Sequence, residues 1–318
     1  MWISPYKYVL SLGHLCSDIN QSILSAVLPF LIATYHYDYT TAAMLVTVSN
    51  VFGAFVQPFI GMLSDKKNKL LYMTLGVLLA SGGMAVTGFI SNFFGLWIVV
   101  IMSGIGVAMF HPQAAKLFNS VSSKNAKGKG MSIFSFGGKV GFTLGPVYTA
   151  FLMNLFGMKG TILFLIPGIV FGIVCSFFNK DFENLDVLEV ENKEKVKSEQ
   201  KDDWSGFIKL CCVVFSRSIL SNGISTFLAF YFIQQFSKSN SFASMLLSVF
   251  YGIGSITLLG GGIADCFGHR KMVRLSFCIF LPAIFIFTNT SHFVIALIML
   301  IFMTCGESLS YSPMVVLG

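Results

Sequence analysis

Long apolar runs separated by short polar segments fill almost the whole chain. The hydrocarbon core of a bilayer is about 30 Å thick and requires roughly 20 apolar residues of helix. Ten runs approach that length, and they lie at about 8–34, 42–62, 70–90, 93–115, 130–153, 160–179, 207–234, 242–264, 272–290 and 293–317. The ten-residue segments of alternating polarity that form membrane strands do not occur, so the pattern predicts ten membrane-spanning helices.

The composition points to a membrane protein and excludes a soluble enzyme. Hydrophobic residues make up 55% of the 318 residues and charged residues 11%, whereas about a quarter of an ordinary soluble domain is charged. Six of the seven cysteines lie within apolar runs, and none forms a C-x-x-C pair. We therefore expect these cysteines to be small core residues, and we expect neither a metal site nor a bound cofactor.

Basic residues follow the even-numbered runs. The segments after the second, fourth, sixth and eighth runs contain Lys66, Lys67, Lys69, Lys116, Lys124, Lys127, Lys129, Lys180, Lys193, Lys195, Lys197, Lys201, Arg270, Lys271 and Arg274. The opposite connections contain only Lys159 and Lys238. Because cytoplasmic loops carry the excess of Lys and Arg, we predict a plasma (inner) membrane protein with a cytoplasmic N-terminus.

This distribution also bears on possible partners. The net charge of +7 is spread over short segments between apolar runs, and it forms no basic face that would bind nucleic acid. The expected partners are the lipid bilayer and a small-molecule substrate, and we expect a monomer.

Two related segments indicate an internal duplication. GMLSDKKNK at 61–69 is followed much later by GGIADCFGHRK at 261–271, so that Gly61 and Asp65 recur as Gly261 and Asp265. A charge-rich polar segment lies between the two copies, and it is typical of a cytoplasmic linker. The predicted organisation is an N-terminal half at 1–180, a linker at 181–204 and a C-terminal half at 205–318.

The two related segments resemble the Gly-x-Leu/Ile-x-Asp-Arg-x-Gly-Arg-Arg/Lys loop of the major facilitator superfamily. Three other stretches resemble the fosmidomycin-resistance family of efflux transporters: GHLCSDINQSILSAVLPFL at 13–31, GVAMFHPQAAKL at 106–117 and SIFSFGGKVGFTLGP at 132–146. The resemblance implies an all-α major facilitator fold of two six-helix halves, in which the first helix of each half lines a central cavity. With ten runs, the last two helices are missing, and the chain is then a fragment or a truncated product.

The resemblance also implies secondary active transport, with the proton-coupled efflux of a fosmidomycin-like drug as the first expectation. The chain has no G-x-x-x-x-G-K-[ST] motif for ATP, so a proton gradient is the expected energy source. The loop copies are expected to latch and release during conformational change. Their motif residues are Gly61, Asp65, Gly261, Asp265, Gly268 and Arg270.

Ionisable residues inside the apolar runs are the candidate functional groups, because an unpaired charge in the bilayer costs several kcal/mol. The candidates for proton coupling are Asp18, His111 and Glu307. The candidates for the substrate or the cavity are Asn20, Gln21, Gln113, Lys139 and Arg217. Since Asp18 and Arg217 lie on the first helices of the two halves, we predict that they face each other across the cavity. The alternative is a structural ion pair between the halves.

Two further motifs lie in the fourth and fifth runs. His111 precedes Pro112, which suits either a gate at a helix kink or a packing histidine. The residues Gly137, Gly138, Gly141, Gly145 and Pro146 form a stripe that permits close helix approach. The stripe resembles the antiporter signature of exporters, but Thr149 and Ala150 stand where that signature has glycines.

Three other functions stay open. One is the import of a small anionic metabolite, and another is a membrane receptor or scaffold that has lost transport. An intramembrane enzyme is disfavoured, because His14, Asp18 and His111 lack the H-E-x-x-H spacing of a metal site.

Overall fold

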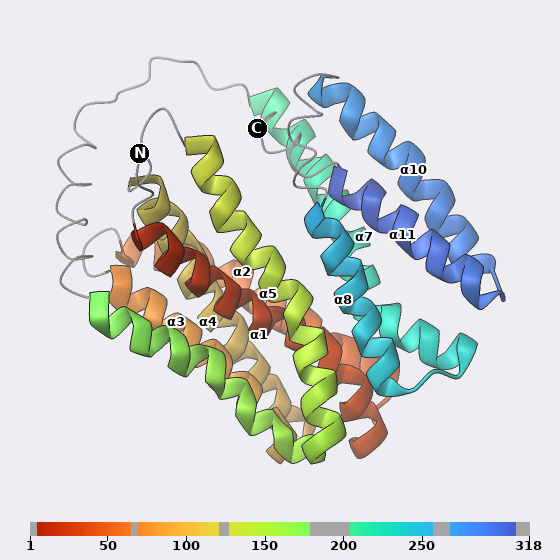
Figure 1. Ribbon diagram of the computed structural model, residues 1–318, viewed down its shortest axis with the longest axis horizontal. Coiled ribbons are helices and arrows are strands. Elements are labelled where there is room, and N and C mark those ends of the chain that lie inside the picture. The colour runs from red at the N-terminus through yellow and green to blue at the C-terminus, as the bar shows by residue number, and fades with distance from the viewer. Residues whose placement is uncertain (1–4, 65–68, 121–126, 179–203, 257–267, 310–318) are drawn as a thin grey trace. The chain divides into compact units, whose positions relative to one another are not determined.

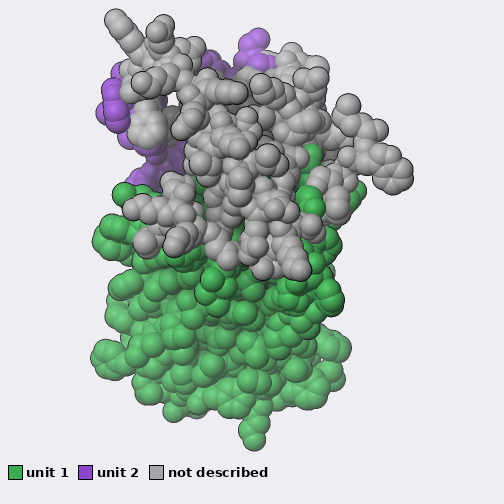
Figure 2. Space-filling view, turned by 90° about the vertical axis from the view of Figure 1, so that its left-hand side faces the viewer, with its two compact units in different colours: residues 1–197 green, residues 198–318 purple. Residues whose placement is uncertain are grey.

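The computed structural model describes residues 5–64, 69–120, 127–178, 204–256 and 268–309, and every regular element within these ranges is helical. The chain divides into two compact units, residues 1–197 and residues 198–318 (Figure 2). Each unit is a bundle of long helices (Figure 1).

The first unit contains α1 (Pro5–Tyr35), α2 (Tyr39–Ser64), α3 (Lys69–Val86), the 3-10 turn η1 (Thr87–Phe89), α4 (Phe93–Ser120), α5 (Lys127–Phe156), the 3-10 segment η3 (Gly157–Leu165) and a helix at 166–178. The second unit contains α7 (Trp204–Phe236), α8 (Asn240–Ile256), α10 (His269–Asn289) and α11 (Phe293–Leu309).

The helices coincide with the ten predicted runs. Among the described residues, seven helical stretches are long and apolar enough to cross a membrane, and one of them, Phe134–Phe178, covers both the fifth and the sixth run. α8 and α11 have 17 described residues each. The sixth run differs in detail, because Gly157 has a φ of 57° and ends α5, and the chain then continues as a 3-10 segment before the regular helix begins.

Two sequence expectations are wrong. Lys116 was expected in a loop, but α4 continues to Ser120, and the Nζ of Lys116 donates a hydrogen bond of 3.3 Å to the Gly61 carbonyl. Cys211, Cys212 and Cys278 are exposed on the helices and are not core residues. An apolar run cannot distinguish these two environments, because a surface that faces lipid is as apolar as a core.

The turn between the first two helices has the same geometry in both units. His36 follows α1 and Ser237 follows α7, and both have a positive φ, of 56° and 50°. Asp38 then accepts a hydrogen bond from the Thr41 N–H, and Ser239 accepts one from the Phe242 N–H. The same chain reversal and the same helix cap are therefore built twice from different residues. The two matching turns therefore show which residues of α7 correspond to which residues of α1.

The crossing of the third and fourth helices is repeated as well. A side chain at Gly106 would meet the backbones of Gly76 and Ala80, and a side chain at Gly306 would meet those of Ser276 and Phe280. Both crossings need a residue without a side chain at the point where the two helix backbones approach each other. The two glycines align α11 with α4, and the packing of each unit follows one plan.

Candidate functional site

A buried carboxylate lies at the centre of the first unit. The side chain of Asp18, in the middle of α1, is 5% exposed. Its Oδ2 lies 3.3 Å from the Nε2 of His14, one helical turn earlier, and its Oδ1 lies 3.3 Å from the Nε2 of His111 on α4. One carboxylate thus contacts two imidazoles from different helices.

The ring of His14 is held in place by α5. The Phe134 carbonyl accepts a hydrogen bond of 2.8 Å from the Nδ1 of His14. The two rings are also stacked, with centroids 4.2 Å apart and planes at 27°. With Nδ1 bound to the Phe134 carbonyl, Nε2 is the ring nitrogen that faces Asp18.

The glycine stripe on α5 makes room for this arrangement. A Cβ at Gly138 would lie 2.5 Å from the Oδ2 of Asp18 and 2.6 Å from the Nε2 of His14. Side chains at Gly137, Gly141 and Gly145 would collide with Ser11, Leu15 and Ser22 of α1, respectively. The stripe therefore lies against α1, Pro146 follows it inside α5, and Gly138 is the position that touches the ionisable groups.

His111 is the most exposed member of this cluster. Its side chain is 27% exposed, and its ring meets the ring of His14 edge-on at 5.2 Å. Pro112 lies within α4, immediately after it, and removes one backbone hydrogen bond from that turn. Both oxygens of Asp18 therefore lie in the interior, and His111 is the member of the cluster that is partly exposed.

The three ionisable side chains converge closely. One nitrogen or oxygen atom from each of His14, Asp18 and His111 lies within 4.8 Å of the others. The spacing along the sequence does not reveal such a set, because His111 comes from a different helix. The lone pairs of these atoms can bind protons.

Two of the other candidates in the first unit have structural partners. Asn20 is buried and donates hydrogen bonds to the Cys16 carbonyl and to the Ser81 hydroxyl on α3. Gln113 is also buried, and it donates a hydrogen bond of 3.2 Å to the Ile60 carbonyl near the end of α2. Gln21 is exposed and Lys139 is half-buried.

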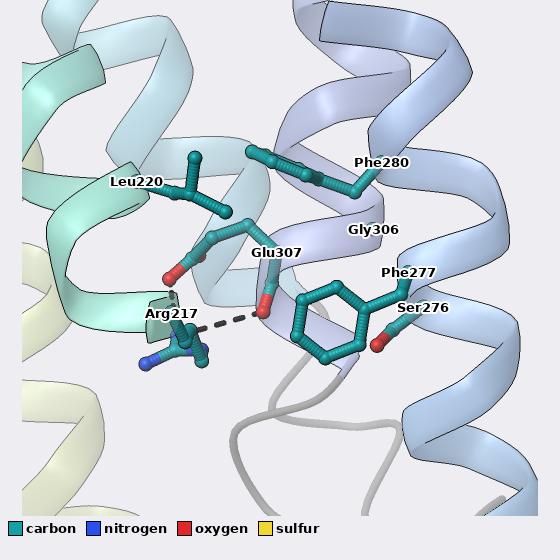
Figure 3. Close-up of a pocket in the computed structure, with 7 residues that line it drawn as sticks. All are labelled: Arg217, Leu220, Ser276, Phe277, Phe280, Gly306 and Glu307. Atoms are coloured by element: carbon teal, nitrogen blue, oxygen red, sulfur yellow. Dashed lines mark hydrogen bonds and ion pairs between the residues drawn. The ribbon is translucent and has the colours of Figure 1, made fainter. Parts of the chain in front are cut away.

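The second unit contains a different charged pair. The guanidinium of Arg217 on α7 donates to the carboxylate of Glu307 on α11, and the two side chains are 14% and 10% exposed (Figure 3). Leu220, Phe277 and Phe280 surround the pair with apolar groups, and these residues leave only a small cavity of about 10 Å³ beside it. The ion pair thus links the first and fourth helices of its own unit.

The repeat shows which part of a unit this pair occupies. In the alignment given by the matching turns, Arg217 corresponds to Cys16 on α1. In the alignment given by the matching helix crossings, Glu307 corresponds to Val107 on α4. Cys16 and Val107 are 2% and 9% exposed, and Cys16 belongs to the apolar core of the first unit. The pair therefore lies in the helix-packing layer, and each charge has a partner within its own unit. The predicted juxtaposition of Asp18 with Arg217 stays a prediction.

The loop motif is described only in part. Gly268 has a φ of 89°, which a residue with a side chain rarely adopts, and its carbonyl accepts the first hydrogen bonds of α10. Arg270 is exposed, and the carbonyl of Gly61 is the acceptor for Lys116. Asp65, Gly261 and Asp265 lie outside the described residues.

Comparisons with known proteins agree with this architecture. A sequence model of the Major Facilitator Superfamily matches residues 10–318. The fosmidomycin resistance protein of Escherichia coli (strain K12) is 23% identical over 271 residues, and the match covers 83% of this chain and 66% of that protein. The multi-drug resistance efflux pump PmrA of Streptococcus pneumoniae serotype 4 is 28% identical over 148 residues, 45% of this chain and 36% of the pump.

A solved structure shows the same fold. The crystal structure of a bacterial homologue of the human lysosomal transporter Spinster has a TM-score of 0.78 at 16% identity, and the alignment covers 98% of this chain and 73% of that one. The chain thus spans about two thirds of the length of the E. coli relative and about three quarters of this structure.

Proposed function

Because the chain belongs to the major facilitator superfamily, we propose that it is a secondary active transporter that exports a small organic compound in exchange for protons. Its helices make it an integral membrane protein, and the loop charges support a cytoplasmic N-terminus. The similarity to a fosmidomycin resistance protein and to a multidrug efflux pump favours export and a drug-like substrate.

The observation that carries the proton coupling is the burial of Asp18 between two imidazoles. A carboxylate in the hydrocarbon layer is stable only when it is paired or protonated, and both His14 and His111 lie within 3.3 Å of its oxygens. Histidine is the side chain that gains and loses a proton near neutral pH. Asp18 is therefore the proton acceptor in this proposal, and the more exposed His111 is its gate.

The charged pair of the second unit has a structural role in this proposal. Arg217 already binds a carboxylate in the packing layer, so an anionic substrate would have to displace Glu307 to reach it. A buried pair that loses one partner leaves an unpaired charge, which is strongly destabilising. Arg217 and Glu307 therefore hold α7 to α11 while the first unit exchanges the proton.

The test measures proton movement directly. The chain is reconstituted in vesicles that contain a pH-sensitive dye, and fosmidomycin is added under an imposed pH gradient. The proposal expects proton flow when the drug is added, and it expects Asp18→Asn to reduce that flow to the level of empty vesicles. Asp38→Asn is the matched control, since Asp38 lies in the exposed turn after α1. Undiminished proton flow with Asp18→Asn would reject the assignment.

A further inference from the structure

We propose that the proton exchanged by this transporter sits between His14 and Asp18, on the side away from His111, and that His14 transmits its loss to α5. This inference rests on the proposed function and adds to it a residue with a defined role. His14 is a positioning residue here, because it acts through Asp18 by controlling the protonation of that carboxylate.

The first step concerns the tautomer of His14. A backbone carbonyl can only accept a hydrogen bond, so the contact of 2.8 Å with Phe134 requires a hydrogen on the Nδ1 of His14. A neutral imidazole carries one ring hydrogen. In neutral His14 the Nε2 atom is therefore an acceptor, and it faces Asp18 with a lone pair.

The second step concerns the contact with Asp18. A lone pair on Nε2 and a carboxylate oxygen repel each other, yet these two atoms lie 3.3 Å apart. The contact becomes attractive when one further proton lies between them, either on Nε2 as an imidazolium or on Oδ2 as a carboxylic acid. The close approach of His14 to Asp18 is thus the geometry of the proton-loaded state.

The third step distinguishes the two histidines. Among the residues that the structure describes, no backbone carbonyl accepts from the Nδ1 of His111, and its Nε2 lies 3.3 Å from Oδ1. A neutral His111 can therefore carry its own hydrogen on Nε2, facing Oδ1, which is buried and has no hydrogen-bond partner within the described ranges, and a small turn of the ring would satisfy Oδ1 without an additional proton. The His111 contact can persist in both protonation states, whereas the His14 contact cannot.

The fourth step is the link to α5. When the shared proton leaves, the Nε2 of His14 and the carboxylate repel each other, and the ring has to turn. It is stacked on Phe134, bonded to the Phe134 carbonyl and in contact with Gly138. Turning the ring breaks that bond and disturbs the α1–α5 contact. Lys139, half-buried and next to Gly138, is a basic group on the helix that packs against His14.

The experiment counts the protons that the purified chain in detergent releases between about pH 5.5 and 9, a range in which an ordinary aspartate stays ionised, and compares the unmodified chain with Asp18→Asn. The unmodified chain is expected to release about one proton per molecule more than Asp18→Asn. His14→Gln should remove this difference, because the glutamine amide donates a hydrogen to Oδ2 without an added proton. His111→Gln should keep the difference. His36→Gln, in the exposed turn after α1, is the matched control and should also keep it.

A second measurement on the unmodified chain guards against misfolded variants. In ¹⁵N spectra of imidazole-labelled protein, the His14 signal should show a hydrogen on Nδ1 in the proton-loaded state, and the proton shared between Nε2 and Asp18 should disappear as the pH rises. A proton difference that survives His14→Gln, or a His14 ring that carries its hydrogen on Nε2, would overturn the inference. Equal titration of the unmodified chain and Asp18→Asn would instead reject the proposed function.

Discussion

The two units share one packing plan but place their ionisable groups differently. The turn after the first helix and the crossing of the third and fourth helices recur in both. In the first unit, Asp18 and His14 lie on α1, and the corresponding residues of α7 are the exposed Ile219 and Phe215. The second unit has its charged pair where the first has apolar core residues. Backbone packing has thus been kept in both copies, while a buried carboxylate between two imidazoles occurs, among the described residues, in the first unit alone.

A second difference between the units lies at the C-terminal end of α10. In the first unit the N–H of Gly88 donates to the hydroxyl of Thr161, so η3 packs against the end of the third helix. In the second unit the corresponding Thr288 lines an apolar cavity of about 260 Å³ between α7, α10 and α11. The first unit therefore fills with its own residues a space that is open among the described residues of the second.

The largest expected effect tests whether the charged pair is structural. Arg217→Cys and Glu307→Val introduce the corresponding residues of the first unit. Each single change removes one charge of the pair from an apolar layer and should lower the free energy of unfolding by about 3–5 kcal/mol. The double variant removes both charges and should be more stable than either single variant. Thermal and denaturant unfolding in mild detergent measure this coupling.

The outcome of this double-mutant cycle also bears on the comparison of the two units. If the losses from the single changes simply add in the double variant, the two residues do not form a structural pair. The Asp18-dependent proton flow of the double variant should equal that of the unmodified chain. Its loss would show that the second unit shares in proton chemistry.

A smaller effect is expected from adding a methyl group on the glycine stripe. Gly138→Ala places a Cβ against Asp18 and His14, and overpacking of this kind costs about 1–3 kcal/mol. Gly223→Ala on α7 is the matched control, because nothing lies within 4 Å of its added Cβ. The control should be neutral or more stable by up to about 1 kcal/mol, since alanine favours helix. Equal melting temperatures for the two variants would contradict the close contact at Gly138.

Much of the fold follows from the sequence, because runs of about 20 apolar residues have few other solutions than membrane helices. The repeat and the glycine stripe are also visible in it. The partners of the buried charges are less accessible, since they depend on how each helix is rotated. The spacing of His14 and Asp18 at i and i+4 places them on one face, but the approach of His111 from α4 requires the packed structure.

Arg217 illustrates this limit. In the alignment given by the matching turns at His36 and Ser237, Arg217 corresponds to Cys16, which lies two positions before Asp18. Two positions on a helix differ by about 200° in direction. A shift of one position in the alignment of the repeats is therefore enough to change the face on which a side chain is expected. Hydropathy alone does not fix that alignment, whereas the backbone geometry of the turns does.

The smallest expected effect concerns the turn that both units share. Hydrogen bonds from Thr41, from its side chain and its backbone N–H, hold the pKa of Asp38 below its ordinary value, while the corresponding cap in the second unit is the uncharged Ser239. A lowered pKa in the folded state means that the stabilisation is present above the ordinary aspartate pKa and is lost as the pH falls through the folded value.

Asp38→Ser should therefore lower the melting temperature slightly at neutral pH, and the difference from the unmodified chain should vanish in acid. Ser239→Asp should give the second unit the same dependence on pH, because its oxygen would accept from the Phe242 N–H in the same turn. Melting curves of both variants from neutral to acid pH measure this. A difference that grows as the pH falls would mean that the two turns, despite their matching backbones, do not cap their helices in the same way.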